Sequence, residues 1–266
     1  MKGVADTYEI SNGNIKAISK DKTMDKYGLI GKTLGHSFSR GYFNNRFAEE
    51  HLDAVYSNYE IPSIDGLKDI LEDKEIVGLN VTIPYKQDVI PLLDGLSDET
   101  NRIGAVNVVK IDKETRKLTG YNTDVLGFVE SIRPLIKPNR RKALILGTGG
   151  ASKAVQYGLS QLGIECLFVS RTKRKGLITY SDINSDVLAE HKIIVNCTPL
   201  GTFPNIKECP ELPFNLLNED FLLFDLVYNP EMTQFLKQGK ANGATIKNGL
   251  EMLHLQAKYA WGIWQK

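Results

Sequence analysis

The chain has few cysteines, almost no net charge and no long apolar run, and each shortage excludes a class of protein. Only three of its 266 residues are cysteines, Cys166, Cys197 and Cys209, and no two of them form a Cys-x-x-Cys pair. An odd number of widely spaced thiols is typical of a reducing compartment rather than of a disulfide scaffold. We therefore expect a cytoplasmic protein.

The balance of charges gives no reason to expect a polyanionic partner. Lys plus Arg number 33 and Asp plus Glu 32, so no overall field attracts nucleic acid or an anionic membrane. No apolar run approaches the roughly 18 residues needed to cross a bilayer. The first 26 residues mix both charges and lack the apolar segment of a secretory signal. The histidines show no metal-binding spacing, which predicts no metal site; they are His36, His51, His191 and His254.

What the chain does have is an alternation of short apolar strands with helical patterns. This alternation predicts an α/β protein with mostly parallel sheets, and the length favours two domains. Prolines in the basic stretch 133–141 mark a junction inside the chain, and Asn12-Gly13 suggests a small hairpin within residues 8–18. Strands are expected at 27–31, 55–61, 77–83, 105–112, 118–122, 142–147, 164–170, 192–197 and 221–227. Helices are expected at 41–52, 63–73, 87–101, 124–133, 149–163, 231–242 and 249–264.

A glycine-rich turn follows the strand expected at 142–147. The stretch LGTGGASKA places Gly147, Gly149 and Gly150 where a strand is followed by a helix. In that geometry backbone amides and the helix dipole bind a pyrophosphate, and the missing Cβ atoms let a phosphate approach the main chain. Ser152 stands where the dinucleotide fingerprint has a third glycine or alanine. The pattern indicates a dinucleotide site, with a merely tight strand-to-helix turn as the alternative.

A run of cations follows the next strand, in the sequence SRTKRK. Its members are Arg171, Lys173, Arg174 and Lys175. NAD-binding proteins place an acidic residue here to hold the ribose 2′-hydroxyl, whereas an arginine fork grips a 2′-phosphate. The run therefore favours NADP over NAD. The alternative is an ordinary solvated basic loop.

Polar side chains also gather near the N-terminal strands. In GHSFSR, Ser37 and Ser39 lie two residues apart, so an extended backbone would point both hydroxyls the same way, toward a carboxylate or a polyol. A serine pair in a loop more commonly caps a helix. Sequence alone leaves both interpretations open.

One lysine follows the strand in LNVTIPYK. Asn80 and Thr82 share one face of this strand, and Pro84 ends it, so Lys86 lies just past the carboxyl edge where ligands bind in open α/β sheets. An ammonium in such a cleft can donate a proton to a developing alkoxide. Farther along, Asn107 offers a donor and an acceptor, and Asp124 precedes a helix either as an N-cap or as a carboxylate facing a cleft.

Taken in order, these segments resemble the shikimate dehydrogenase family of NADP-dependent oxidoreductases, from about Tyr27 to Trp264. The matching segments are HSFS, NVTIPYK, GAVN, GYNTD, GTGGASKA, SRT, NCTPLG, DLVYNPEMT and NGLEMLHLQA. The resemblance implies reversible reduction of 3-dehydroshikimate to shikimate by NADPH, without a metal, in the biosynthesis of chorismate and aromatic amino acids.

The resemblance also implies roles for individual residues. Lys86 and Asp124 correspond to the catalytic pair. The implied substrate residues are Ser37, Ser39, Asn80, Thr82, Asn107, Tyr228 and Gln256. The implied cofactor residues are Gly147, Gly149, Gly150, Ala151, Ser170, Arg171, Thr172, Lys175, Thr198, Leu226 and Gly249.

Because Gln256 lies in the last helix, we expect that helix to cross back onto the first domain and to leave a cleft between the two domains. The expected division is a substrate domain of residues 1–123 plus 247–266, with 1–26 as an extension, and a Rossmann-like NADP domain of residues 124–246. The expected partner is a small-molecule substrate, bound by a monomer or homodimer.

Some positions depart from the family pattern. Arg40 replaces a proline and Phe43 a histidine, so the helix after the serines is expected to start differently. Ser170 replaces a common asparagine at the adenosine side. The segment between SRTKRK and the strand at 192–197 is short, which suggests that a crossover helix is reduced to a turn.

Two other functions stay open. One is a quinate/shikimate dehydrogenase that uses NAD, against which the cations after Ser170 argue. The other is a non-catalytic, dinucleotide-binding regulator, which would tolerate loss of Lys86 or Asp124.

Overall fold

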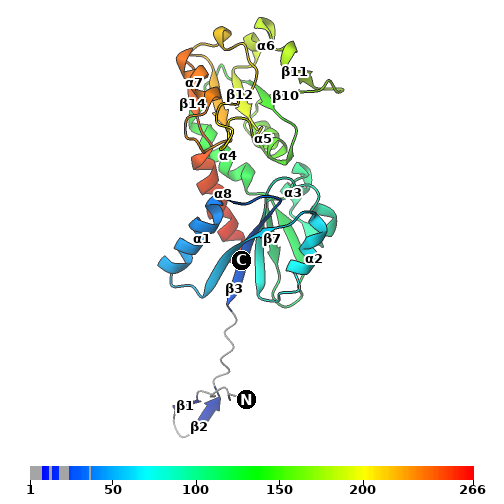
Figure 1. Ribbon diagram of the computed structural model, residues 1–266, viewed down its shortest axis with the longest axis vertical. Helices are drawn as coiled ribbons and strands as arrows, with labels where there is room; N and C mark the ends of the chain where they lie inside the picture. Colours follow the sequence, from blue (N-terminus) through cyan, green and yellow to red (C-terminus); the bar gives the residue numbers. More distant parts are fainter. Residues whose placement is uncertain (1–7, 12–13, 18–23, 36) are drawn as a thin grey trace.

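The computed structural model describes residues 8–11, 14–17, 24–35 and 37–266. Two six-stranded sheets lie one above the other, and the helices α4 (Asp124–Ile132) and α8 (Leu250–Trp264) run between them (Figure 1). Within the described ranges, no helix combines the length and apolar character needed to span a membrane. The predicted α/β class, with two such sheets, is confirmed.

The N-terminal sheet is mixed and has the order β4-β3-β5-β7-β8-β6. Parallel pairing joins β3 to β4, β3 to β5 and β6 to β8, whereas β7 runs antiparallel to both β5 and β8. The central strand β5 is buried along its whole length, as expected for a strand covered on both faces. The strands are β3 (Asp25–Gly31), β4 (Ala54–Glu60), β5 (Ile76–Val81), β6 (Gly95–Leu96), β7 (Val108–Ile111) and β8 (Leu118–Tyr121). The helices beside them are α1 (Phe38–Glu49), α2 (Leu67–Ile70) and α3 (Asp98–Ile103).

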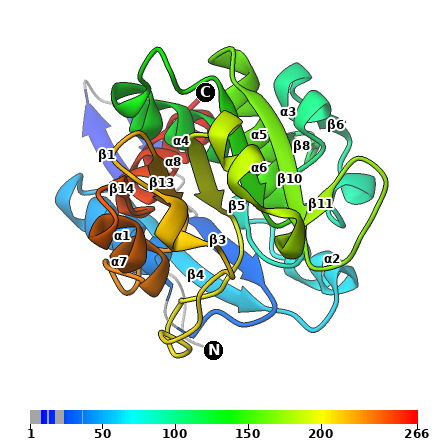
Figure 2. The ribbon, with the colours of Figure 1, turned by 90° about the horizontal axis from the view of Figure 1, so that it is seen from above.

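The C-terminal sheet is entirely parallel and has the order β11-β10-β9-β12-β13-β14. Its central strands place successive side chains on opposite faces, so that Ala143 and Ile145 pack on one side and Leu144 and Leu146 on the other. The strands are β9 (Lys142–Leu146), β10 (Glu165–Ser170), β11 (Ile178–Thr179), β12 (Ile193–Asn196), β13 (Leu222–Asp225) and β14 (Thr245–Lys247). The remaining helices are α5 (Gly150–Gln161), α6 (Ser185–Glu190) and α7 (Gln234–Ala241), seen from above in Figure 2.

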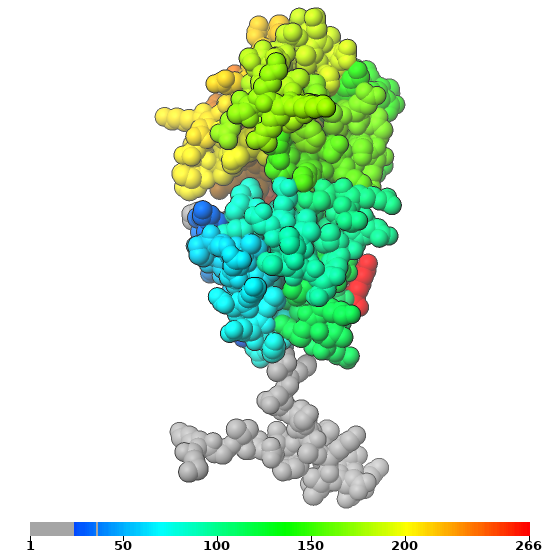
Figure 3. All heavy atoms as spheres, turned by 90° about the vertical axis from the view of Figure 1, so that its right-hand side faces the viewer, coloured from blue at the N-terminus to red at the C-terminus, as the bar shows by residue number. Residues whose placement is uncertain are grey.

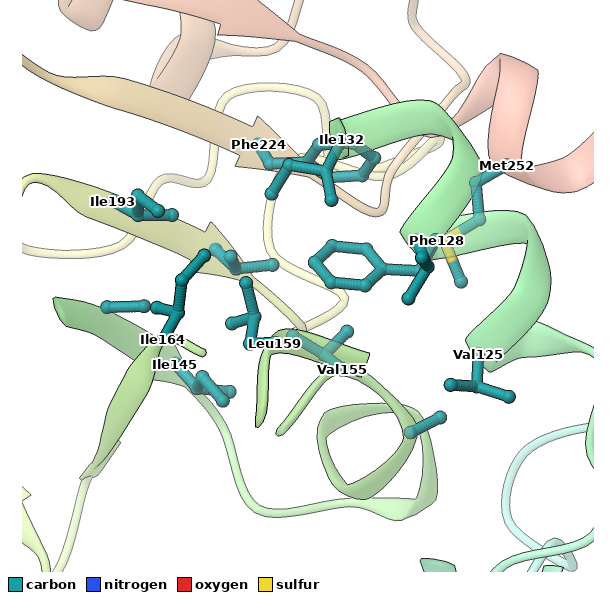
Figure 4. Packing of buried hydrophobic residues seen from close by; sticks show 14 of the residues in the cluster. Val125, Phe128, Ile132, Ile145, Val155, Leu159, Ile164, Ile193, Phe224 and Met252 are labelled. Carbon is teal, nitrogen blue, oxygen red and sulfur yellow. The ribbon is translucent and has the colours of Figure 1, made fainter. Parts of the chain in front are cut away.

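Helices α4, α5 and α8 share one core with the C-terminal sheet. Phe128 of α4 points toward Phe224 of β13, with the ring centroids 5.1 Å apart, and Met252 of α8 closes the cluster (Figure 4). The far end of α8 packs elsewhere, because Trp261 and Trp264 lie against Tyr27 in the N-terminal sheet and the Trp264 indole donates to the Val109 carbonyl at 3.1 Å. The predicted return of this helix to the N-terminal sheet is confirmed.

The hairpin is confirmed by antiparallel pairing of β1 (Tyr8–Ser11) with β2 (Asn14–Ala17). Its predicted turn residues, Asn12 and Gly13, lie outside the described residues, as does His36.

Several predicted elements differ from the structure. Residues 87–101 do not form one helix, because a short 3-10 turn at Ile90–Leu92, which contains a proline, gives way to β6 before Ser97 caps a new helix at Asp98. The helix expected at 63–73 is shortened to α2 after a 3-10 turn. The crossover expected to be a turn contains α6, whose N-cap Asn184 accepts hydrogen bonds from the amides of Asp186 and Val187. The short strands β6, β11 and β14 were not predicted.

Candidate active site

A cavity of about 920 Å³ lies between the two sheets. In Figure 3, the segment around residues 200–206 overhangs the segment around residues 30–40, with a hollow between them. The cavity is lined by every predicted catalytic and substrate residue, namely Lys86, Asp124, Ser37, Ser39, Asn80, Thr82, Asn107, Tyr228 and Gln256. Residues that are up to 219 positions apart in the sequence therefore meet at one site, as Ser37 and Gln256 do.

The lysine and the carboxylate form an ion pair at the wall of this cavity. Lys86 follows β5, and its Nζ donates to Asp124 Oδ2 at 2.6 Å. Their side chains are only 14% and 9% exposed, so water screens the pair little. Asp124 is the first residue of α4, where the helix dipole favours a negative charge. It serves as a carboxylate facing the cavity, and the N-cap interpretation is wrong because Thr123 occupies that position.

An amide network fixes the carboxylate from the other side. Asn107 Nδ2 donates to Asp124 Oδ1 at 2.9 Å, while Asn107 Oδ1 accepts from the Thr123 amide at 2.7 Å. The same Nδ2 lies 3.5 Å from Gln256 Oε1 on α8. Both Asp124 oxygens are thus engaged, which fixes the orientation of the group. Thr123 was not among the predicted site residues, although it lies inside the GYNTD segment.

The serines reach the cavity by a different geometry from the expected one. Ser37 is the N-cap of α1 and its hydroxyl accepts from the Arg40 amide at 3.2 Å, whereas Ser39 already lies in the first helical turn. Of the two interpretations left open by the sequence, the capping one is correct for Ser37, and the extended Ser37–Ser39 segment is not found. A proline at position 40 would have no N–H to donate, so Arg40 permits this cap.

Polar and aromatic side chains complete the substrate side. Asn80, at the end of β5, is 5% exposed and accepts a hydrogen bond from the Tyr56 hydroxyl at 2.7 Å. Tyr228 follows β13 of the opposite sheet, with its ring 6.4 Å from that of Phe38, and burial raises the pKa of its phenol. Tyr56 lies outside the predicted set, because nothing in a buried strand residue distinguishes it in the sequence.

The glycine turn is shaped to receive an anion. Gly147 has a φ of +103°, a conformation that residues with a Cβ rarely adopt. Gly149 is the N-cap of α5 and provides no capping side chain, and no acidic residue stands in the first turn. A Cβ added at Gly149 would meet nothing within 4 Å. The amides of this helix end and the open space beside them fit a pyrophosphate.

The same helix end touches the lysine directly. A Cβ added at Gly150 would lie 2.9 Å from the Cβ of Lys86. Nearby, Lys153 of α5 donates to Gln87 Oε1 at 2.7 Å and approaches the Gly104 carbonyl at 3.4 Å. The nucleotide side and the substrate side therefore pack against each other immediately behind Lys86.

The predicted cofactor residues fall into two groups. Ala151, Leu226 and Gly249 line the cavity. Gly249 packs so closely on the Leu226 carbonyl that an added Cβ would lie 2.2 Å from its oxygen. The remaining members are outside the cavity lining: Gly147, Gly149, Gly150, Ser170, Arg171, Thr172, Lys175 and Thr198.

The cationic run lies at the end of β10, away from the cavity. Ser170 is buried and its hydroxyl accepts from the Thr172 amide at 3.3 Å. Arg171, Lys173, Arg174 and Lys175 are exposed, and among the described residues none of them forms an ion pair. Their charges are available to an anionic group such as a 2′-phosphate.

A second buried carboxylate lies at the end of β13. Asp225, at the end of β13, is fully buried and accepts from Thr233 Oγ1 at 2.6 Å and Asn196 Nδ2 at 2.9 Å. Asn196 Oδ1 in turn accepts from Thr198 Oγ1 at 2.6 Å. Burial raises the pKa of Asp225 to about 6, and these hydrogen bonds oppose the shift. The network was missed because Asp225 and Asn196 stand within apolar strands.

Comparison with known proteins agrees with this arrangement. Residues 29–109 match the shikimate dehydrogenase substrate binding domain. A shikimate dehydrogenase (NADP(+)) of Caldicellulosiruptor saccharolyticus is 38% identical over 259 residues, which cover 91% of this chain and 92% of the relative.

Solved structures give the same result. Shikimate dehydrogenase from Aquifex aeolicus has a TM-score of 0.80 and 34% identity, covering 92% of this chain and 93% of that one. The shikimate 5-dehydrogenase of Thermus thermophilus, in complex with NADP(H) and shikimate, has a TM-score of 0.79 and 31% identity, covering 91% of this chain and 93% of that one.

Proposed function

Because this chain belongs to the shikimate dehydrogenase family, we propose that it catalyses the reversible NADPH-dependent reduction of 3-dehydroshikimate to shikimate, in the biosynthesis of chorismate and aromatic amino acids. The single observation that carries the proposal is the buried Lys86–Asp124 pair, 2.6 Å apart, in a cavity beside the glycine turn. A regulator that only bound a dinucleotide would not need this pair.

In the proposed mechanism Lys86 transfers the proton. Its ammonium lines the cavity and donates a proton to the C3 oxygen of the substrate as the carbonyl is reduced; in the reverse direction Lys86 accepts that proton. Asp124 holds the ammonium through Oδ2, and Asn107 holds Asp124 through Oδ1, so the donor has one position before substrate arrives. Asp124 also accepts a hydrogen bond from the neighbouring substrate hydroxyl.

The far end of the cavity is suited to the substrate carboxylate. Ser37 and Ser39 follow one another across the start of α1, and both hydroxyls can donate to an anion. Thr82, Asn107 and Gln256 surround the ring hydroxyls with donors and acceptors, and Tyr228 covers the site from the nucleotide side. This arrangement distinguishes the two ends of the substrate and sets its C3 atom toward Lys86.

The residues of the nucleotide side fit NADP. When bound, the cofactor supplies the hydride to C3 or accepts it in the reverse direction. The first-turn amides of α5 would hold the pyrophosphate, and Arg171, with Lys175 and Thr172, would hold the 2′-phosphate. In the described part of the chain the cations of this run form no ion pair, which leaves them able to bind that group. Thr198, Leu226 and Gly249 would hold the nicotinamide.

We further propose the domain division expected from the sequence: residues 1–123 plus 247–266 bind substrate, and residues 124–246 bind NADP. The return of α8 to the N-terminal sheet supports it. Of the expected extension, residues 1–26, Asp25 and Lys26 belong to β3. Because one chain supplies the whole cavity lining, a monomer or a homodimer would serve equally. The three free thiols support a cytoplasmic location.

Nicotinamide absorbance during shikimate oxidation tests the proposal. The purified chain is expected to turn over shikimate with NADP, and kcat/KM for NADP should exceed that for NAD by about tenfold or more, because an arginine fork favours the 2′-phosphate. Turnover of quinate with NAD at a higher kcat/KM would instead support the quinate/shikimate alternative. Nucleotide binding without oxidation of either substrate would contradict the proposal and support a regulator.

A further inference from the structure

A buried tyrosine stands directly behind the substrate side of the cavity. Tyr56, in β4, is 1% exposed and is not among the cavity-lining residues, whereas its neighbours Asn80 and Ser39 are. Its hydroxyl donates to Asn80 Oδ1 at 2.7 Å. Tyr56 therefore reaches the site only through other side chains.

This hydrogen bond decides the orientation of the Asn80 amide. An asparagine presents an acceptor oxygen at one end and a donor nitrogen at the other. Because the Tyr56 hydroxyl occupies Oδ1, Asn80 Nδ2 is turned to donate to the Asn107 carbonyl at 3.2 Å. Without the hydroxyl, the amide would lose the partner that distinguishes its two ends.

The hydroxyl itself is held in place. Asn44 of α1 bonds both the amide and the carbonyl of Tyr56, each at 2.9 Å, and the Tyr56 ring stacks on Phe43 with centroids 4.8 Å apart and an interplanar angle of 13°. Burial raises the pKa of the Tyr56 phenol well above its usual range. A neutral phenol in a fixed place thus donates to Asn80.

We propose that Tyr56 is a positioning residue of the substrate site, which sets the Asn80 amide; the inference rests on the proposed function. Tyr56 is connected to Asp124 through Asn80 and then Asn107. The complete series is Tyr56, Asn80, Asn107, Asp124 and Lys86. Because Lys86 and Asp124 keep their own contacts when Tyr56 changes, its effect falls on substrate binding.

Tyr56→Phe removes one oxygen and keeps the ring. The KM for shikimate is expected to rise about tenfold, as for a buried polar group left unpaired, while kcat and the KM for NADP stay within about threefold. Tyr85→Phe is the matched control, because Tyr85 is 4% exposed and its hydroxyl donates to the Ile61 carbonyl at 2.6 Å, away from the cavity lining. It should lower the urea midpoint similarly and leave the KM for shikimate unchanged.

A double-mutant cycle tests the route of the effect. In the Asn80→Ala background, Tyr56→Phe should change the KM for shikimate by less than about twofold, because coupled residues are not additive. Asn44→Ala removes the two hydrogen bonds to the Tyr56 backbone without touching the cavity lining, and it should raise the KM for shikimate as well. If Tyr56→Phe does not fold, this variant tests the positioning role in its place.

The outcomes separate this inference from the proposed function. An inactive wild-type chain would overturn both. An active wild type would overturn the inference alone if Tyr56→Phe kept its KM for shikimate within about twofold, if Tyr85→Phe raised that KM equally, or if the Tyr56 and Asn80 effects multiplied independently.

Discussion

Among the described residues, each half of the molecule buries one carboxylate at the carboxyl end of its sheet, and the two carboxylates differ in their partners. The side chain of Asp124 is 9% exposed and lies against the ammonium of Lys86. Asp225 is fully buried, and its hydrogen-bond donors are the neutral groups of Thr233, Asn196 and the Val227 amide. The first carboxylate is thus part of an ion pair that lines the cavity, whereas the second holds Asn196, which in turn accepts from Thr198.

The cations of the two halves differ in exposure and in pairing. On the substrate side Lys86 is enclosed and paired, whereas on the nucleotide side Arg171 and its neighbours are exposed. An enclosed pair is rigid before ligand arrives; exposed side chains lose rotational freedom when a phosphate binds. We infer that catalysis depends on a prearranged site and that nucleotide selection depends on a loop ordered by its ligand.

The largest expected effect comes from removing the charge on Asp124. Asp124→Asn replaces the partner of Lys86 with a neutral amide, so the ammonium loses its fixed position and kcat should fall on the order of 10²- to 10³-fold. Steady-state kinetics measure this directly. Asp25→Asn is the control, because Asp25 forms a similarly short pair with Lys113, at 2.7 Å, on the surface. A comparable loss in both variants would contradict the role of Asp124.

Asp225, the second carboxylate, is expected to affect the pH dependence of the free energy of unfolding. The pKa of Asp225 rises from 3.8 to about 6 on burial, so the folded state holds this proton more tightly than the unfolded chain. The proton on Asp225 therefore stabilises the folded state fully below about pH 4, and this stabilisation is lost as pH rises to about 6. For a shift of about two pKa units, it amounts to about 2 to 3 kcal/mol in the free energy of unfolding. Because asparagine does not titrate, the stability of Asp225→Asn relative to wild type should increase as pH rises from about 4 to about 6. A pH-independent difference in urea unfolding would contradict this.

The exposed arginine should matter for one cofactor only. Arg171→Gln removes a charged contact to the 2′-phosphate, which is expected to lower kcat/KM for NADP about tenfold and to leave NAD nearly unaffected. The ratio of the two cofactors, measured on the same sample, is the internal control. An equal loss with both cofactors would show that Arg171 supports the fold rather than the phosphate.

The smallest effect concerns the contact between the halves. Gly150→Ala places a Cβ 2.9 Å from that of Lys86 and should displace the lysine slightly, lowering kcat about threefold to tenfold. Gly149→Ala adds a Cβ in open space and is expected to affect the KM for NADP rather than kcat. If Gly150→Ala, like Gly149→Ala, changed only the KM for NADP, the contact between Gly150 and Lys86 would not affect catalysis.

The sequence predicted the substrate side more completely than the nucleotide side. Lys86 follows a predicted strand that ends at Pro84, so its place at the sheet edge was predictable. Asn107 was assigned through the family resemblance. Asn196 and Asp225 also end strands, but their hydrogen bonds join loops that have no regular pattern, and no spacing rule relates them. Tyr56 could not be predicted, because a tyrosine in a buried strand is expected only to pack in the core unless the partner of its hydroxyl is known.

The same limit applies to the fold. Long strands and helices with strong periodicity were predicted nearly to their ends, as α5 and β10 illustrate. The short elements β6 and β11 contain two residues each and form only because a neighbouring strand offers hydrogen bonds. The course of Ser37 and Ser39 depended on one capping bond to the Arg40 amide, which outweighed the extended alternative.

Single-turnover oxidation of shikimate by Lys86→Met, at saturating substrate and NADP, tests the central claim most directly. Loss of the proton-transfer group should slow the chemical step by roughly 10²-fold or more, while the Kd for shikimate changes by less than about threefold. Lys113→Met, from the surface pair, serves as the control and should match wild type. A near-normal single-turnover rate in Lys86→Met, with only weaker shikimate binding, would contradict the assignment of Lys86 as the proton-transfer residue.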